Sequence, residues 1–236
     1  MKYAFVIIVL LGFVAGQAQS KVYVGFKAGG QLATSYMDHT ITTQFITTDF
    51  ITGYTGGALV KVFTKKRDAL INPGLQTGLV FDQKGWGQIF PDTDPEVPKY
   101  RVKLSYIQLP MEAIINFGRG KTKTFFTMGW YLEYLVNVSK SDYPTDAQLQ
   151  QLEDRGIDFY TYRSDRDRKL GYGLRVSAGG QKDFSFGSIH LDVFGTFNIG
   201  SVLDHQNFKT GIPDLSNLYT AGFSIGYLIP FGKLDY

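Results

Sequence analysis

Ser188, His190 and Asp192 follow one another at alternate positions and carry the side chains of a hydrolytic triad. A serine, an imidazole base and a carboxylate are the parts from which acyl-transfer enzymes build an activated nucleophile. On a strand, residues spaced by two stand side by side on one face, and the sequence shows no separate oxyanion-hole element. A hydrolase is therefore the third hypothesis, after two classes that are set out below, and we expect that the protein is not an enzyme.

A second set of residues with metal-binding side chains lies in segments that we predict to be loops. Asp38–His39 and Asp204–His205 each combine a carboxylate with an imidazole, and "PDTDPE" carries Asp92, Asp94 and Glu96. These are ligand types for a divalent cation, but their spacing matches no known site. We interpret them as solvated loop residues, so the sequence predicts neither a metal nor a cofactor.

The composition favours a single domain rich in β-strands. The 236 residues include 27 Gly, 19 Phe and 15 Tyr, which are typical of strands and tight turns. No cysteine is present, which excludes disulfides, thiolate zinc sites and cysteine nucleophiles. The formal net charge of +3 is spread among acidic residues and forms no basic stripe, so we expect no nucleic-acid partner.

The first residues have the three regions of a secretory signal peptide. Lys2 precedes an apolar run from Ala4 to Ala15, and small residues follow at Gly16 and Ala18. We expect residues 1–18 to be the signal peptide and 19–236 to be the outer-membrane barrel domain. A retained membrane anchor is the alternative, but the run is shorter than the ~20 residues that a spanning helix needs. An exported membrane protein of this kind must cross with strands.

Segments of alternating apolar and polar residues follow, each near the ~9–11 residues of a tilted membrane strand. They are Val22–Ala33, Ile51–Phe63, Ile71–Lys84, Tyr100–Phe117, Thr124–Asn137, Leu170–Gln181, Ser188–Gly200 and Leu218–Phe231. Short connections such as "GRGKTK" alternate strictly with long ones. This pattern predicts an all-β, eight-stranded antiparallel up-and-down transmembrane β-barrel with short periplasmic turns and long extracellular loops.

The strands separate a large apolar face from a polar one when they are read with a period of two. In Thr124–Asn137, for example, Phe126, Trp130 and Tyr134 oppose Glu133. Aromatic residues also recur near strand ends, as in the girdles of membrane barrels, so we assign the apolar face to lipid. A soluble lipocalin-like barrel with the aromatic face inside is the competing interpretation.

With the polar face inward, charged and polar side chains fill the lumen and plug it, because an eight-stranded barrel is just wide enough for side chains. Groups of both signs must then be paired or hydrated. We expect Arg175 and Asp192 to lie diagonally across neighbouring strands and to pair. The predicted lumen network consists of Lys27, Lys61, Gln76, Asp82, Lys84, Gln108, Glu112, Glu133, Arg175, His190 and Asp192.

One strand breaks the alternation. Pro110 removes a donor from the ladder, which requires a bulge or a locally broken pairing. Before it, the apolar Val102 and Leu104 share the parity of the polar Gln108. A bulge near Ser105–Tyr106 would restore the facing and turn the two apolar residues toward lipid.

Residues 138–169 form a long predicted loop. In "PTDAQLQQLEDRG", Thr145 as N-cap, Gln148 in a capping box and Gly156 as a stop predict a short helix. The "YTYRSDRDRK" that follows is either a solvated, salt-bridged loop or an extracellular contact surface for a protein, a glycan or a lipopolysaccharide phosphate. The candidate contact residues are Tyr160, Tyr162, Arg163, Arg166 and Arg168.

Four stretches, "VYVGFKAGGQLATS", "YIQLPMEAIINFG", "FFTMGWYLEYLV" and "AGFSIGYLIPF", resemble the PorT-like outer-membrane β-barrel family that is common in Bacteroidetes. The resemblance covers essentially the whole mature chain. It implies an outer-membrane barrel, and the namesake of the family is associated with a protein secretion system. Because these motifs mostly encode barrel geometry, they assign no functional residues.

We therefore expect an integral protein of the bacterial outer membrane with a structural or interaction role in the cell envelope, or a subunit of an envelope or secretion assembly. The expected partners are outer-membrane lipid, lipopolysaccharide and other envelope proteins. A small porin-like or ligand-binding transport barrel is the alternative hypothesis. Conductance and ligand-dependent stabilisation distinguish these two classes.

Overall fold

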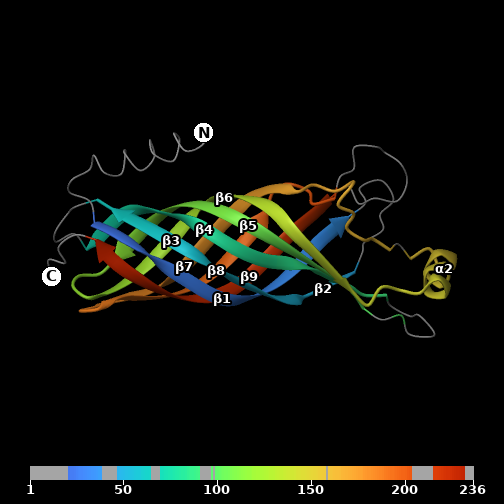
Figure 1. Ribbon diagram of the computed structural model, residues 1–236, viewed down its shortest axis with the longest axis horizontal. Coiled ribbons are helices and arrows are strands. Elements are labelled where there is room, and N and C mark those ends of the chain that lie inside the picture. The colour runs from blue at the N-terminus through green and yellow to red at the C-terminus, as the bar shows by residue number, and fades with distance from the viewer. Residues whose placement is uncertain are drawn as a thin grey trace.

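A computed structural model of the chain describes residues 21–38, 47–64, 70–90, 97, 99–157, 159–203 and 215–231. Its antiparallel strands wind obliquely around a long cylinder (Figure 1). The strands are β1 (Lys21–Asp38), β2 (Thr48–Asp49), β3 (Ile51–Phe63), β4 (Ile71–Gln88), β5 (Tyr100–Phe117), β6 (Thr122–Ser141), β7 (Leu170–Phe184), β8 (Gly187–Asn198) and β9 (Leu215–Phe231).

The sheet closes into a ring. Its order is β2-β4-β3-β1-β9-β8-β7-β6-β5, and β4 also pairs with β5. Because β2 has only two residues and pairs with β4 alone, eight long strands form the ring. This confirms the predicted eight-stranded antiparallel up-and-down barrel. The strand pattern in the sequence does not predict β2, because two residues are too few to show a period.

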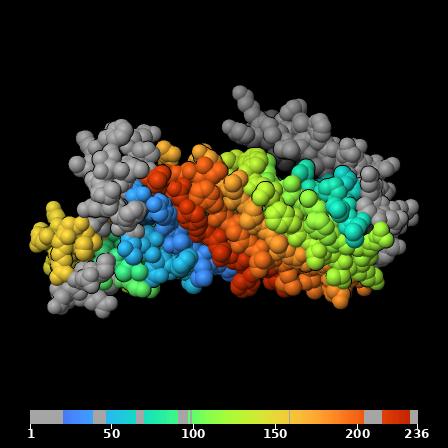
Figure 2. Space-filling view, turned by 180° about the vertical axis from the view of Figure 1, so that it is seen from behind, coloured from blue at the N-terminus to red at the C-terminus, as the bar shows by residue number. Residues whose placement is uncertain are grey.

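Large apolar side chains cover the outside of the barrel. On β6, Phe126, Trp130 and Tyr134 are 42%, 46% and 54% exposed, whereas Glu133 on the opposite face is 2% exposed. The same alternation runs through the other long strands, and Figure 2 shows them crossing the cylinder obliquely. Such a wall places apolar surface against lipid and polar groups inside, the reverse of a soluble barrel.

The two ends of the barrel differ. β1 begins and β9 ends at the end that carries the short β5–β6 and β7–β8 turns, where Val22 pairs with Phe231. Helix α2 (Asp146–Asp154) lies beyond the opposite end (Figure 1). Short turns are periplasmic in outer-membrane barrels, so we assign the α2 end to the extracellular side. None of the helices in the described ranges is long and apolar enough to cross a membrane.

The predicted irregularity in β5 is present, but it has a different consequence. The pairing of β5 with β6 shifts register between Ser105 and Tyr106, and the shift skips Val136 of β6. Because the additional residue belongs to β6, the facing of β5 does not change. Val102 and Leu104 point inward and are 0% exposed, so the expectation that they face lipid was wrong.

Helix α2 begins with the predicted capping box. The Thr145 hydroxyl accepts a hydrogen bond from the Gln148 amide, and the Gln148 side chain accepts one from the Thr145 amide at 2.9 Å. Gly156 follows the helix with φ of 67°, a left-handed conformation that glycine adopts without a Cβ penalty. Leu152, which is 1% exposed, fixes the helix to the apolar cluster described below.

Candidate functional site

The barrel interior holds all eleven predicted lumen residues, and each is at most 4% exposed. The network is balanced in charge, because four carboxylates face four basic side chains. Burying a charge is costly unless it is paired and hydrogen-bonded, so this balance is what permits the set to be buried. The carboxylates are Asp82, Glu112, Glu133 and Asp192, and the basic groups are Lys27, Lys61, Lys84 and Arg175.

The extracellular third of the network is built around Lys84. Its ammonium lies 2.7 Å from Glu133 Oε2 and 4.0 Å from Asp82 Oδ2, and it donates to Asn198 Oδ1 at 3.0 Å. Asn198 in turn donates to Glu133 Oε1 at 3.0 Å. The Lys84 ammonium also lies 4.9 Å from the centroid of the Tyr131 ring, a cation–π distance. Strands β4, β6 and β8 are thereby tied together across the lumen.

The middle of the network does not contain the expected pair of Arg175 with Asp192. Arg175 Nε instead lies 3.3 Å from Glu112 Oε1, and its guanidinium carbon lies 4.0 Å from the centroid of the Phe194 ring. Asp192 accepts a hydrogen bond from the Ser224 hydroxyl. The predicted pair was wrong because the β7–β8 register places Asp192 opposite Gly179, four residues from Arg175.

The hydrolytic set is not assembled near the periplasmic end. The Ser188 hydroxyl donates to Asp183 Oδ1 at 2.5 Å, whereas Nδ1 of His190 lies 2.9 Å from the Lys61 ammonium. His190 Nε2 lies 3.6 Å from Asp192 Oδ2. A hydrolase needs the serine hydroxyl on the imidazole, and here the hydroxyl is bonded to a different carboxylate. The three residues therefore do not form a nucleophile, base and acid in series.

Apolar clusters lie across both ends of the polar network. At the periplasmic end the cluster consists of Tyr23, Leu59, Phe63, Ile114, Phe125 and Leu228. At the extracellular end a larger cluster, which we call the cap, includes Met37, Trp86, Phe90, Tyr100, Val102, Leu104, Tyr106, Leu152, Tyr160, Tyr162, Leu203 and Leu218. The described part of the lumen therefore has packed apolar side chains at each end of the polar network.

Two of the five candidate contact residues belong to this cap. Tyr160 is 4% exposed and Tyr162 is 0% exposed, so neither offers its ring to an external partner, contrary to the expectation for a contact surface. The Tyr162 hydroxyl donates to the main-chain oxygens of Arg168 at 3.2 Å and Asp167 at 3.4 Å. Burial and the nearby Asp167 charge raise the pKa of Tyr162 to about 12. The part of the loop that carries Tyr160 and Tyr162 thus folds into the barrel mouth.

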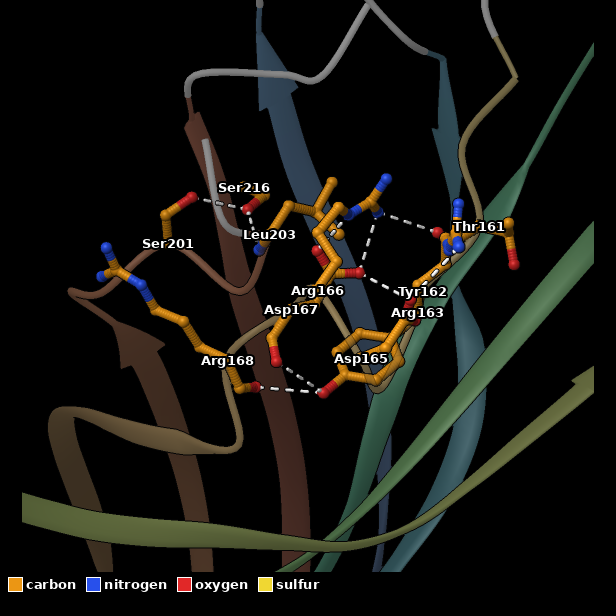
Figure 3. Close-up of polar contacts among 10 residues, drawn as sticks. All are labelled: Thr161, Tyr162, Arg163, Asp165, Arg166, Asp167, Arg168, Ser201, Leu203 and Ser216. Carbon is orange, nitrogen blue, oxygen red and sulfur yellow. Dashed lines mark hydrogen bonds and ion pairs between the residues drawn. The ribbon is translucent and has the colours of Figure 1, made fainter. Parts of the chain in front are cut away.

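Arg166 stabilises the cap from within the same loop (Figure 3). Its Nε and Nη2 donate to the two carboxylate oxygens of Asp167 at 2.7 and 2.8 Å, and Nη2 also donates to the Thr161 main-chain oxygen at 3.1 Å. This bidentate bond raises the pKa of Arg166. Of the candidate contacts, only Arg163 and Arg168 are exposed.

The strand pattern did not reveal the cap, although one signal in the sequence could have done so. Val102 and Leu104 share parity with the inward Gln108. Without an assumed bulge, this parity places both apolar residues inside the extracellular end of the lumen.

Most of the potential metal ligands in the loops, including His39 and His205, lie outside the described residues. Within the described ranges, no group of three or more His, Asp or Glu side chains could hold a metal ion.

A family model for the outer membrane protein beta-barrel domain matches residues 15–204. This match covers most of the chain and includes all of the predicted lumen residues. A search of curated proteins gives no significant match.

Several solved structures have a similar fold. Ail of Yersinia pestis is 9% identical, with a TM-score of 0.34 over 88% of this chain and 98% of the other. Neisserial surface protein A is 13% identical, with a TM-score of 0.38 over 86% of this chain and 96% of the other. The N-terminal β-barrel domain of Pseudomonas aeruginosa OprF is 9% identical, with a TM-score of 0.36 over 89% of this chain and 98% of the other. At these scores we draw no functional argument from the similarity.

Proposed function

The chain belongs to the outer membrane protein beta-barrel domain family, and from this premise we propose that it serves the envelope as a closed structural or interaction barrel. It is an integral protein of the bacterial outer membrane. Its lumen holds a charge-balanced network with an apolar cluster across each end. That arrangement is the observation that carries the proposal, because a channel needs a hydrated path and this lumen is filled by side chains.

Conductance in planar lipid bilayers tests the closed state. We expect no ion current from the refolded protein, and a heat-modifiable band on a denaturing gel would show that the sample is folded. A matched variant, Leu104→Ser with Tyr106→Ser, removes two side chains of the cap and reports how far the cap seals the mouth. Stable single-channel steps from the parent protein would contradict the proposal.

A ligand-binding or transport barrel is the second candidate, and one observation favours it. Both carboxylate oxygens of Asp82 and all three guanidinium nitrogens of Arg175 are buried without a hydrogen-bond partner among the described residues. Buried polar atoms are normally satisfied by protein or by ordered water, so the middle of the lumen suits water or a small polar solute. Thermal stabilisation by a panel of small ions and sugars in detergent distinguishes this candidate from the first.

We also propose that the chain is a PorT-like barrel of Bacteroidetes that is associated with an envelope or secretion assembly. The four sequence stretches that resemble this family support both parts of the proposal.

We propose that residues 1–18 are removed on export, which intact-mass measurement of the membrane protein tests directly.

Arg163 and Arg168 are the exposed candidates for contact with a protein or lipopolysaccharide. Photo-crosslinking from position 163 in intact cells would identify such a partner.

A further inference from the structure

The middle of the lumen contains a donor pole, which is the guanidinium group of Arg175. This side chain is 1% exposed, and none of its three nitrogens has a hydrogen-bond partner among the described residues. Its Nε lies 3.3 Å from Glu112 Oε1, and one face of the guanidinium lies over the Phe194 ring. A guanidinium binds a carboxylate through two parallel N–H donors, so this pole suits the carboxylate of a solute.

An acceptor pole is formed by β1, β3 and β4. Its buried oxygens without a hydrogen-bond partner in the described part of the chain are Gln31 Oε1, Thr55 Oγ1 and both carboxylate oxygens of Asp82. Thr55 is paired with Asp82 on one side and with Gly29 on the other, two residues from Gln31. The Lys84 ammonium is 4.0 Å from Asp82 Oδ2, beyond hydrogen-bond distance. This patch of acceptors therefore suits an ammonium group.

The two poles face each other across the barrel. In the ring of eight, β3 and β7 are four strands apart in either direction, so they lie on opposite sides. The register leads from Arg175 to Lys61 on β3 in one direction around the ring. In the other direction it leads to Ile51. Because barrel strands tilt evenly, the height of Arg175 on β3 is midway between these two residues, next to Thr55.

Glycines leave parts of this layer of the wall without side chains. Gly129 is paired with Arg175, and Gly57 lies on β3 two residues from Thr55. A Cβ at Gly57 or Gly129 would lie 2.1 Å from a main-chain oxygen of the neighbouring strand, so a larger residue does not fit at either position. An eight-stranded barrel is narrow, and the space between the poles therefore suits a solute of only a few heavy atoms.

The balance of charge in the lumen selects a solute without net charge. The described network contains four carboxylates and four basic side chains, so a bound anion or cation would add a buried charge without a counter-charge. Water can bond to either pole, but it has no charge to complement a guanidinium or a carboxylate. A solute with a carboxylate at one end and an ammonium group at the other complements both poles and keeps the balance.

We propose that the middle of the lumen binds a small zwitterion of the α-amino acid class. Its carboxylate lies at Arg175, and its ammonium group lies at Asp82 and Thr55. This site rests on the ligand-binding barrel, the second candidate function above, and it specifies the class of solute that such a barrel holds.

Retention of isotope-labelled solutes through refolding tests this site. Because apolar clusters lie across both ends of the network, the protein is refolded in detergent with the solute present, and free solute is then removed by gel filtration. The probe is glycine. Acetate and methylammonium each carry one of its charged groups, and acetamide is dipolar but uncharged. We expect about one glycine per barrel by NMR, and about tenfold less of each other solute, because each lacks at least one charged contact.

Two threonine variants provide a matched comparison. The Thr55 hydroxyl is part of the acceptor pole, whereas the Thr127 hydroxyl is already hydrogen-bonded to that of Ser177 at 2.7 Å. Thr55→Val should lower glycine retention about fivefold, and Thr127→Val should leave it unchanged. Arg175→Lys keeps the charge but loses the planar fork, so retention should fall about tenfold. Heat-modifiable migration confirms that each variant is folded.

Equal retention of glycine and acetate would reveal an anion site, and equal retention of glycine and methylammonium would reveal a cation site. Either result would overturn the proposal, as would equal losses in the two threonine variants. A folded barrel that retains none of the four solutes would also overturn it. Thermal stabilisation by other ions or sugars would then still support a ligand-binding barrel, and conductance tests the closed barrel independently. The failure of this site is thus distinguishable from the failure of either proposed function.

Discussion

The Lys84 ammonium and the Glu133 carboxylate lie 2.7 Å apart with both side chains fully buried, and they join β4 to β6 across the lumen. A pair in such surroundings is stable only if its remaining hydrogen-bonding capacity is satisfied. Asn198 and Gln108 donate to the two oxygens of Glu133 at 3.0 and 3.4 Å. The lumen is thus held by a connected set of contacts and not by isolated pairs.

Replacing Glu133 with Gln should destabilise the folded barrel strongly. The change keeps the volume but leaves the Lys84 ammonium buried without its nearest opposite charge, which costs about 3–5 kcal/mol. Urea unfolding in lipid vesicles, followed by tryptophan fluorescence, measures this loss. The matched control is Asp49→Asn, which removes an exposed pair with Lys99 at 2.9 Å and should cost less than about 1 kcal/mol. Equal losses in the two variants would refute the role given to the buried pair.

Truncating Leu152 to Ala should release helix α2 from the cap. Leu152 is the buried side chain of this helix. Its truncation to a methyl group leaves a cavity, which should weaken the docking of the helix by about 2–5 kcal/mol. Limited proteolysis should then cut loop 142–169 faster while the barrel keeps its heat-modifiable migration. Gln150→Ala changes an exposed position of the same helix and should leave the cleavage rate as in the parent.

Asp167 and Asp165 lie two residues apart in one loop, and replacing each by Asn should have different effects on the stability of the cap. Asp167→Asn removes the charge that Arg166 binds with two nitrogens at 2.7 and 2.8 Å, so the cap should lose about 1–3 kcal/mol. Asp165→Asn affects only an exposed pair with Arg163 and should have little effect. Hydrogen exchange of the amides in residues 160–168 compares them, and equal protection in both variants would count against the Arg166 bond.

The cap should loosen in alkaline solution. The pKa of Tyr162 is about 12 in the folded loop and about 10 when the ring is released, so the released state loses its proton first. The stabilisation that neutral Tyr162 gives to the docked loop is therefore fully present below pH about 10, and it is lost as the pH rises through about 12. Proteolysis of loop 142–169 against pH measures this decline. Tyr162→Phe cannot ionise, so its cleavage rate should lack the alkaline rise.

The sequence predicted the wall well because lipid imposes a simple rule on it. Every long strand must show apolar side chains outside, so Phe126, Trp130 and Tyr134 report the facing of β6 directly. The capping box of α2 was equally readable, since Thr145 and Gln148 act on neighbouring backbone groups. Both features depend on contacts that are local along the chain.

The interior was harder to predict because it depends on registers between strands. Arg175 meets Glu112 from β5 and not Asp192 from the neighbouring β8, and only the stagger of the ring decides this. Tyr160 and Tyr162 carry the same side chains whether the loop is solvated or inserted in the mouth. The parity of strand residues says which face they occupy, but it does not say which partner lies across the lumen.

The seam between β1 and β9 determines when the barrel can close. Val22 at one end of the described chain pairs with Phe231 at the other, a separation of 231 − 22 = 209 residues. Contacts between such distant segments form slowly, because all of the intervening chain must be ordered or looped out first. The pairing of β1 with β9 is therefore the step that closes the ring. We expect the opening of this seam to limit the lifetime of the folded protein in the membrane.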